Sequence, residues 1–340
     1  MISYFNRLIN KSKGGVFIIA EACDNHMGSL EIAKSLVDAA VYAGADAVKF
    51  QHHLPHEEML EDVPKSKNFD EPLFDFLLKN SLNINDHVKL KKYCDQKKIL
   101  YLCTPFSYMA SKEISSLVPF FKIGSGEFQD YWFIDRLSKL KKPILFSSGM
   151  CSESELFENV DYFKSINIDF AILNCLSEYP PIYEDMNLGF IKTLTERLDG
   201  TVIGHSDHSN EIFTSIIACS FGAKIIEKHL TLSKFIKGPD SDVSIDPDQF
   251  KQLVNNLREI NKTLGYRKKI NRKEKIIRSW AYRSVVTTRD LKKNTKLSHL
   301  DIKTKRPGIG INSKSYKLII NKKLKKNVKA NKLLALSDFE

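Results

Sequence analysis

Two histidines near acidic residues, each following a short apolar run, are the side chains in this chain best suited to chemistry. His208 comes shortly after Val202 and Ile203, and His229 follows Ile225 and Ile226. A buried strand needs apolar residues and has no need of an imidazole at its end. Two neutral imidazoles near carboxylates suit Mn²⁺, Mg²⁺ or Zn²⁺ acting as a Lewis acid on a carbonyl, or an acid–base pair. Either histidine alone is also typical of a hydrogen-bonded core or surface residue.

Polar residues also stand at the ends of other apolar runs, and together with the two histidines they form two groups of different charge. The acidic and imidazole group comprises Glu21, His208, Glu227, His229 and Asp240. The cationic, hydroxyl-rich group comprises Lys49, Gln51, Thr104, Lys122, Ser125 and Ser147. Two ammonium groups with hydroxyl donors suit a phosphate and a carboxylate together. An unpaired ammonium in an apolar strand is costly, so each lysine needs either a bound anion or a nearby acid.

The elements that must position these residues are eight apolar runs of strand length separated by segments of helix length. Alternation of this kind favours a parallel sheet, and eight units over about 250 residues suit a closed (β/α)8 TIM barrel. A doubly wound open sheet is the alternative. In a barrel all the polar strand ends meet at one mouth. The expected strands are Val16–Cys23, Ala47–Gln51, Leu100–Pro105, Phe120–Glu127, Pro143–Ser148, Phe170–Cys175, Thr201–Ser206 and Ala223–His229.

The helices between the strands carry recognisable start and stop signals. Ser29 precedes a 3.6-residue apolar period that ends at Gly44, and Asp246-Pro247 begins the last barrel helix, which Gly265 ends. We therefore expect a barrel over residues 1–265, a basic linker over 266–280 and a small, mainly β domain over 281–340. A proline–glycine loop led by an arginine, RPGIGI, starts at Arg306 in this last domain.

Composition excludes several other classes of protein. The chain has 42% hydrophobic residues and no apolar run of membrane-spanning length, and its start lacks the apolar core of a secretory signal. The six cysteines show no CxxC spacing, which indicates reduced thiols and a cytoplasmic protein. We expect neither a membrane nor a nucleic-acid partner.

Charge is unevenly distributed along the chain. From Tyr266 onward 23 basic and 5 acidic residues give +18, whereas the rest of the chain carries −7. A basic tail can bind nucleic acid. This one has little of the aromatic interleaving that single-strand binders use, so a solvated basic face that offers one or two residues to an anionic ligand is the preferred interpretation.

The segment HHLPHEE, which contains His52, His53 and His56, directly follows Gln51. It is either a separate metal site or a loop at the rim of the mouth, and its position favours the rim.

From the residues alone we expect a metal-assisted barrel enzyme that acts on a small phosphorylated or carboxylated substrate and a carbonyl partner. A metal-dependent hydrolase or isomerase using Asp207 and His208 as a dyad, and a non-catalytic binding module in the basic tail, are the alternatives.

The chain resembles the sialic acid synthase family, the bacterial nonulosonic acid synthases, from Val16 to Glu340. The resemblance rests on ten motifs in order: IIAEACDNHMGS, AGADAVKFQ, TPF, FKIGSGE, SSGM, SEYP, GHSDHS, GAKIIEKHLT, GPDSDVS and RPGIGI. It implies that the tail is an antifreeze-like (SAF) domain. It also implies condensation of phosphoenolpyruvate with an acetamido-sugar related to N-acetylmannosamine, giving a nine-carbon α-keto acid and phosphate.

The resemblance also implies roles for individual residues. His208 and His229 match ligands of a divalent metal, with Mn²⁺ expected first and Mg²⁺ or Co²⁺ as alternatives. Glu21 matches a carboxylate that meets the sugar and assists proton transfer. The residues matching phosphoenolpyruvate contacts are Lys49, Gln51, Thr104, Lys122, Ser125, Ser147, Ser177, Ser206 and Arg283. Those matching sugar contacts are Asn68, Tyr179, Glu227, Asp240 and Arg306. Arg306 matches an arginine that reaches the sugar's N-acyl group from the partner chain, and this role implies a domain-swapped homodimer.

The chain departs from the family pattern around the sugar side. Asp24 and Met27 replace commoner residues, His52 and His53 stand where Thr-Phe is frequent, and NCLSEYP differs from HCTNIYP. These changes leave four acceptors open: N-acetylmannosamine, its 6-phosphate, and the diamino-dideoxy precursors of legionaminic and pseudaminic acid.

Overall fold

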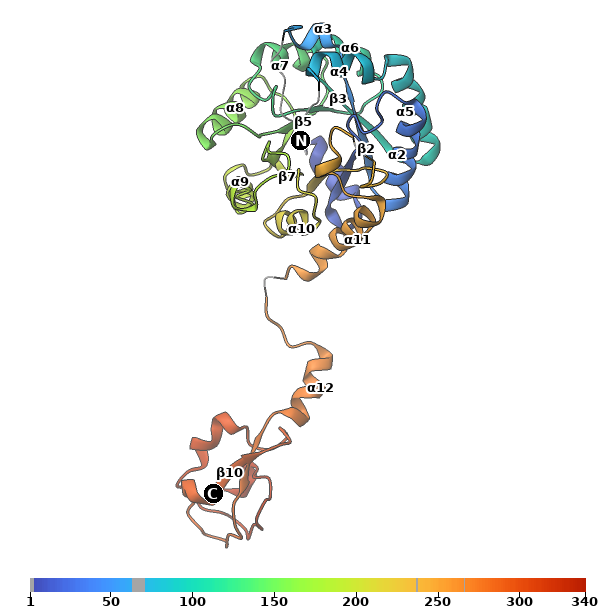
Figure 1. The fold of residues 1–340 in the computed structure, drawn as a ribbon. Coiled ribbons are helices and arrows are strands. Elements are labelled where there is room, and N and C mark those ends of the chain that lie inside the picture. The colour runs from blue at the N-terminus through green and yellow to red at the C-terminus, as the bar shows by residue number, and fades with distance from the viewer. Residues whose placement is uncertain (1–2, 63–70, 237, 266) are drawn as a thin grey trace. The chain divides into compact units, whose positions relative to one another are not determined.

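The computed structural model describes residues 3–62, 71–236, 238–265 and 267–340. The chain divides into two compact units, Met1–Leu264 and Gly265–Glu340. The first unit contains the predicted barrel and the second contains the predicted tail domain (Figure 1).

The first unit is built on eight parallel strands in the order β3-β2-β1-β8-β7-β6-β5-β4. The first strand pairs with the last, and β3 packs beside β4, so the sheet closes on itself as a barrel rather than opening as a doubly wound sheet. The predicted (β/α)8 barrel is therefore confirmed. The strands are β1 Phe17–Glu21, β2 Ala47–His52, β3 Leu100–Pro105, β4 Phe121–Ile123, β5 Ile144–Ser147, β6 Phe170–Cys175, β7 Val202–Asp207 and β8 Ile225–His229.

Helices surround the strands, and their ends follow the sequence signals. Ser29 caps α2 by accepting a hydrogen bond from the Ile32 amide, and Gly44 ends the helix at a φ of 82°, a backbone conformation that glycine adopts without strain. The helices of this unit are α1 Tyr4–Lys11, α2 Leu30–Ala43, α3 Pro55–Glu58, α4 Leu73–Asn80, α5 Ile84–Lys97, α6 Tyr108–Ile114, α7 Tyr131–Ser138, α8 Glu153–Ser165, α9 Phe190–Arg197, α10 Phe213–Ser220 and α11 Pro247–Thr263.

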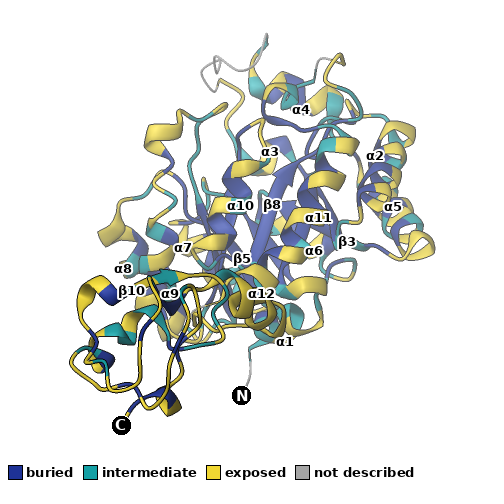
Figure 2. Cartoon of the chain, turned by 90° about the horizontal axis from the view of Figure 1, so that it is seen from below, coloured by how far each residue is buried: buried dark blue, intermediate teal, exposed yellow. Residues whose placement is uncertain are grey.

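Helix α1 was not predicted, and it closes the amino-terminal end of the barrel. Phe5 is fully buried and its ring lies 5.2 Å from that of Phe120, which directly precedes β4. The backbone amide of Tyr4 donates to the Asp169 carboxylate, just before β6. Figure 2 shows α1 and α4 at opposite ends of the buried strands. The barrel therefore has a packed floor opposite its mouth.

The second unit begins with a helix and continues with short strands and turns. Helix α12 Arg272–Ala281 occupies most of the segment predicted as a linker, 266–280, and ends one residue beyond it. Strands β9 Ser284–Thr287 and β10 Ile302–Lys305 pair antiparallel, and the unit has its own apolar core around Val285, Leu297 and Leu334. The tail domain is therefore an independent fold rather than an extension of the barrel.

Among the described residues, no helix combines the length and the apolar character that crossing a membrane requires. All six cysteines are free thiols.

Candidate active site

The carboxyl ends of the barrel strands bring the predicted residues to one place. In the strand register Glu21 lies opposite both Lys49 and His229, and Gln51 lies opposite Thr104. These ends surround a cavity of about 600 Å³ at the mouth of the barrel. Distant parts of the sequence therefore share one opening, as the barrel interpretation requires.

Most of the predicted site residues line this cavity. They are Glu21, Lys49, Gln51, Thr104, Lys122, Ser125, Ser147, Ser177, Tyr179, Ser206, His208, Glu227, His229 and Asp240. Asn68 lies outside the described residues. Arg283 and Arg306 belong to the second unit, where both are exposed and the Arg306 side chain donates to the carbonyl of Ala281 at 3.0 Å.

Lys49 and Lys122 are buried and have carboxylate partners. The sequence predicted instead that cationic and acidic residues would lie on separate sides of the mouth. Lys49 contacts the Glu21 carboxylate and also lies 3.6 Å from Glu227. Lys122 lies 3.7 Å from the same Glu227 carboxylate oxygen. Glu227, expected beside the sugar, therefore lies between the two ammonium groups. Nearby acids, rather than a bound anion alone, balance the charge of these lysines.

Hydroxyl groups complete the surroundings of the lysines. Lys49 donates to Thr104 at 2.9 Å and Lys122 donates to Ser147 at 2.7 Å. The Ser206 hydroxyl donates to Glu227 at 3.2 Å. These ammonium and hydroxyl groups form a buried cluster of donors that can bind an anionic ligand once the carboxylates release them.

Burial and neighbouring charge set the protonation of this cluster. Burial raises the pKa of Glu21 to about 7, although Lys49 opposes the shift. For Glu227 the two lysines outweigh the effect of burial and hold its pKa below the ordinary value. Burial lowers the pKa of Lys122, although Glu227 opposes the shift. A carboxyl group with a pKa near 7 can exchange a proton at neutral pH, which makes Glu21 suitable for acid–base catalysis.

His208 and His229 lie side by side at the mouth, with ring centroids 5.4 Å apart. The Nδ1 of His208 lies 2.7 Å from the Leu176 carbonyl, and a carbonyl accepts only, so Nδ1 carries the proton. Its Nε2 is then free to accept and lies 3.0 Å from the hydroxyl of Tyr179, whose ring stacks on the imidazole. This tautomer leaves Nε2 as the nitrogen that a metal would bind.

His229 belongs to a second cluster of potential metal ligands. Its ring nitrogen, the Cys23 thiol and an Asp240 carboxylate oxygen all lie within 4.8 Å of one another. The Nδ1 of His229 is buried and has no hydrogen-bond partner. A buried imidazole with an unpartnered nitrogen, in a group with a thiol and a carboxylate, fits a divalent cation, so the residues present are compatible with the metal that the sequence predicts.

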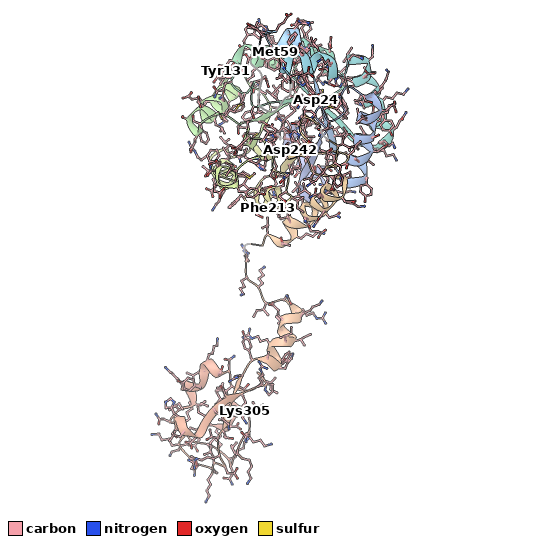
Figure 3. The ribbon with its side chains drawn as sticks, viewed as in Figure 1. Asp24, Met59, Tyr131, Phe213, Asp242 and Lys305 are labelled. Carbon is pink, nitrogen blue, oxygen red and sulfur yellow. The ribbon has the colours of Figure 1, made fainter. Side chains whose placement is uncertain are left out.

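Several cavity residues were not assigned to the site from the sequence: Cys23, Asp24, His53, Glu58 and Glu127. His53 lies 3.0 Å from the Glu58 carboxylate and 2.9 Å from the Gln51 side-chain oxygen. Burial raises the pKa of Asp24 to about 6 and that of Glu127 to about 7. Figure 3 labels Asp24 and, near α3 and α4, the cavity residue Met59. The position of Cys23, Asp24 and His53 within three residues of a strand end was the available signal, whereas Glu58 and Glu127 lie further from their strands.

The three histidines of HHLPHEE do not form a separate metal site. His52 lies 2.7 Å from Glu113, His53 faces the cavity, and His56 is exposed beside Glu61. The segment lies at the rim of the mouth, as its position favoured.

The proposed dyad of Asp207 and His208 is not formed. Asp207 pairs with Lys228 at 3.1 Å and accepts hydrogen bonds from Thr214 and Ser215. His208 instead contacts the Leu176 carbonyl, the Tyr179 hydroxyl and the Cys175 sulfur. Neighbouring residues of a strand point to opposite faces, which separates the two side chains. The structure therefore disfavours a hydrolase that depends on this pair.

Three known proteins show what the chain is similar to. The chain is 35% identical to the pseudaminic acid synthase of Campylobacter jejuni, with 96% of this chain and 97% of that protein covered. It is 34% identical to the N,N'-diacetyllegionaminic acid synthase of Legionella pneumophila, with 98% of this chain and 99% of that protein covered. The crystal structure of N-acetylneuraminic acid synthetase from Leptospira borgpetersenii, in complex with citrate, matches with a TM-score of 0.70 at 31% identity, covering 77% of this chain and 90% of that one.

Family profiles match both units of the chain. The NeuB family profile matches residues 36–269 and the SAF domain profile matches residues 282–340. The chain therefore belongs to the NeuB family of synthases and carries a C-terminal SAF domain.

Proposed function

We propose that the enzyme condenses phosphoenolpyruvate with an acetamido-sugar of the N-acetylmannosamine type, giving a nine-carbon α-keto acid and inorganic phosphate. The observation that carries this proposal is the meeting of Lys49 and Lys122 with His208 and His229 in one cavity. The names of the relatives support a nonulosonic acid as the product.

Phosphoenolpyruvate binds at the lysine cluster in this proposal. Its phosphate and carboxylate compete with Glu21 and Glu227 for the two ammonium groups, and the hydroxyl oxygens of Thr104 and Ser147 already accept hydrogen bonds from the same two nitrogens. Ser125 adds a hydroxyl that accepts from the Gly149 amide at 3.0 Å. The exchange of a carboxylate partner for a ligand anion keeps the lysines paired at every stage.

Carbon–carbon bond formation then requires an electrophilic aldehyde above the enol carbon. Carbon 3 of phosphoenolpyruvate attacks the aldehyde carbon of the open-chain sugar, water adds at carbon 2, and phosphate leaves with the bridging oxygen. Glu21, at the boundary of the two ligands and with a pKa near 7, exchanges the proton that the new hydroxyl and the water require.

The metal site lies on the sugar side. His208 and His229 would hold a divalent ion, Mn²⁺ in the first instance, which supplies Lewis-acid polarisation of the aldehyde carbonyl. Tyr179 orients His208 through its ring and its hydroxyl before the ion binds.

The charge of the cavity wall disfavours one of the four acceptors. Asp24, Glu58, Glu127 and Asp240 all line the cavity, with His53 as the neighbouring imidazole. This carboxylate-rich wall repels a second phosphate, so we expect N-acetylmannosamine 6-phosphate to be a poor acceptor. The precursors of legionaminic and pseudaminic acid are neutral diamino-dideoxy sugars and remain the alternative acceptors, which two relatives' names favour.

We also propose that the enzyme works as a homodimer in which the SAF domain of one chain completes the cavity of the other. Arg306 is the residue that would reach the N-acyl group of the sugar.

A phosphate-release assay with phosphoenolpyruvate, Mn²⁺ and the four acceptors tests the proposal, with mass spectrometry of the product. We expect turnover with at least one neutral acetamido-sugar and a nine-carbon α-keto acid as product. Lys49→Ala and Lys122→Ala should abolish turnover, whereas Lys139→Ala, a change at an exposed residue, should not. Absence of phosphate release with every acceptor, from folded and metal-loaded enzyme, contradicts the proposal.

A further inference from the structure

The loop that follows β1 places a thiol in the candidate metal site. Cys23 is 5% exposed, lines the cavity, and has its sulfur within 4.8 Å of both a His229 nitrogen and an Asp240 oxygen. Among the described residues this is the group of three side chains whose donor atoms could hold a metal ion together. Sulfur, imidazole nitrogen and carboxylate oxygen are the donors from which zinc-type sites are built.

Two further observations indicate that this group is arranged for a ligand. His229 is 6% exposed, yet its Nδ1 has no hydrogen-bond partner. Cys23 has a φ of 46°, a left-handed conformation that is uncommon for a residue other than glycine. The backbone therefore adopts an unfavourable conformation at the residue whose sulfur lies within 4.8 Å of a His229 ring nitrogen.

We propose that Cys23 is a metal ligand, acting with His229 and Asp240, so that the ion of this enzyme is bound in part by a thiolate. The catalytic use of the ion rests on the proposed function, whereas the binding of the ion does not. His208, with its Nε2 facing Tyr179, is available as the fourth ligand once the tyrosine hydroxyl is displaced.

A thiolate changes the metals that the site selects. One thiolate and one carboxylate carry two negative charges, which balance a divalent cation in a buried position. Thiolate sulfur is a soft ligand that favours Zn²⁺ and Co²⁺, whereas Mg²⁺ and Mn²⁺ prefer oxygen ligands. We therefore expect this chain to bind Zn²⁺ and Co²⁺ much more tightly than Mn²⁺ or Mg²⁺, and to lose part of that preference when the sulfur is removed.

Cobalt substitution provides a readout that is independent of turnover. Metal-free full-length enzyme is titrated with Co²⁺, and the sulfur-to-cobalt charge-transfer absorption in the near ultraviolet is recorded. The variants are Cys23→Ser and, as the matched control, Cys175→Ser. Cys175 also lines the cavity, and its sulfur lies 4.0 Å from His208 Nδ1, but it is not part of the group of three.

The expected result is a charge-transfer band in the wild type and in Cys175→Ser, and its loss in Cys23→Ser. The affinity for Zn²⁺ should fall on the order of 100-fold in Cys23→Ser, with a smaller change for Mn²⁺. A band that persists in Cys23→Ser, or that disappears only in Cys175→Ser, overturns the proposal.

Thiol labelling of the wild type keeps the test decisive even if Cys23→Ser does not fold. Zn²⁺ should protect Cys23 from alkylation, measured by peptide mass spectrometry, while labelling of the half-buried Cys151 stays unchanged. Labelling of Cys23 in the metal-free enzyme that Zn²⁺ leaves unchanged overturns the proposal. Phosphate release from the same samples separates the two hypotheses, because a thiolate-bound metal without turnover contradicts only the proposed reaction.

Discussion

Asp207 and Lys228, the residues next to the two histidines of the proposed metal site, form an ion pair 3.1 Å long in which both side chains are fully buried. Asp207 also accepts hydrogen bonds from the hydroxyls of Thr214 and Ser215 in α10. Burial alone would raise the pKa of Asp207, but Lys228 and these hydroxyls outweigh it and hold the pKa well below the ordinary value. The pair therefore joins the ends of β7 and β8 and fixes the backbone that carries His208 and His229.

Replacing Asp207 by asparagine should lower the free energy of unfolding by about 3–5 kcal/mol, because it leaves the Lys228 ammonium buried without a counter-charge. The measurement is urea-induced unfolding near neutral pH. Glu153→Gln is the control, since Glu153 pairs with Arg197 on the surface with about half of each side chain exposed, and should cost no more than about 1 kcal/mol. The double variant Asp207→Asn/Lys228→Met should recover part of the loss. Equal effects of the buried and the surface changes would contradict this account.

Gly149→Ala should impair phosphoenolpyruvate binding without unfolding the protein. A methyl group on Gly149 would overlap the hydroxyl of Ser177 and lie 2.7 Å from that of Ser125, so both side chains must move. We expect kcat/KM for phosphoenolpyruvate to fall roughly 10- to 100-fold, since small displacements of positioning groups have effects of that size. Gly189→Ala is the matched control, because a methyl group there meets no atom within 4 Å. Unchanged kinetics in Gly149→Ala would remove both serines from the proposed anion site.

Stability should depend on pH through Glu127, whose pKa burial raises to about 7 from an ordinary 4.5. The folded protein binds the proton of this carboxyl group more tightly than the unfolded chain does. The resulting stability is fully present below pH 4.5, the pKa in the unfolded chain, and is lost as the pH rises through about 7, the pKa in the folded protein. Glu127→Gln, which is neutral at every pH, should therefore gain stability relative to the wild type between pH 4.5 and 8, by up to about 3 kcal/mol. Thermal or urea unfolding of both proteins across this range measures the difference. A difference that does not vary with pH would show that Glu127 titrates normally.

Arg306→Ala should raise KM for the sugar roughly 10- to 100-fold, the effect of losing one charge-assisted hydrogen bond, while metal binding is unchanged. Lys314→Ala, a change at an exposed lysine of the same domain, should leave KM unaltered.

The proposed exchange of domains gives this prediction a second test. Arg306→Ala and Lys122→Ala chains are each defective, but in a mixed dimer the barrel with an intact Lys122 receives Arg306 from the other chain. Unfolding and refolding the two variants together should restore activity. Lack of recovery in a refolded dimer would place Arg306 beside the barrel of its own chain or outside the site.

Sequence patterns predicted the barrel well because its strands are continuous apolar runs with a polar end. The expected boundaries of β3 and β6 coincide with the observed ones. Each of these segments is defined by its own local pattern. Helix α1 was missed because its burial depends on Phe120 and Asp169, which are far away in the sequence.

The sequence predicted which residues line the cavity, but not which acidic residue pairs with which lysine. Strand ends indicated that Lys49, Lys122, Glu21 and Glu227 would meet at the mouth. Which acid faces which lysine depends on the register between strands, and apolar strands do not specify that register in their own sequence. The role proposed for Cys23 was hidden for a different reason: a cysteine ending an apolar run is typical of an inert buried thiol.

The floor that α1 forms beneath the barrel has a kinetic consequence. With Phe5 filling the far end, molecules enter and leave on the side where Tyr179 and Met150 are exposed. A ligand held against Lys49 and Lys122 lies beneath whatever binds at the rim, so we expect an obligatory order of arrival: the three-carbon anion first and the sugar second, with the long product departing before phosphate can escape.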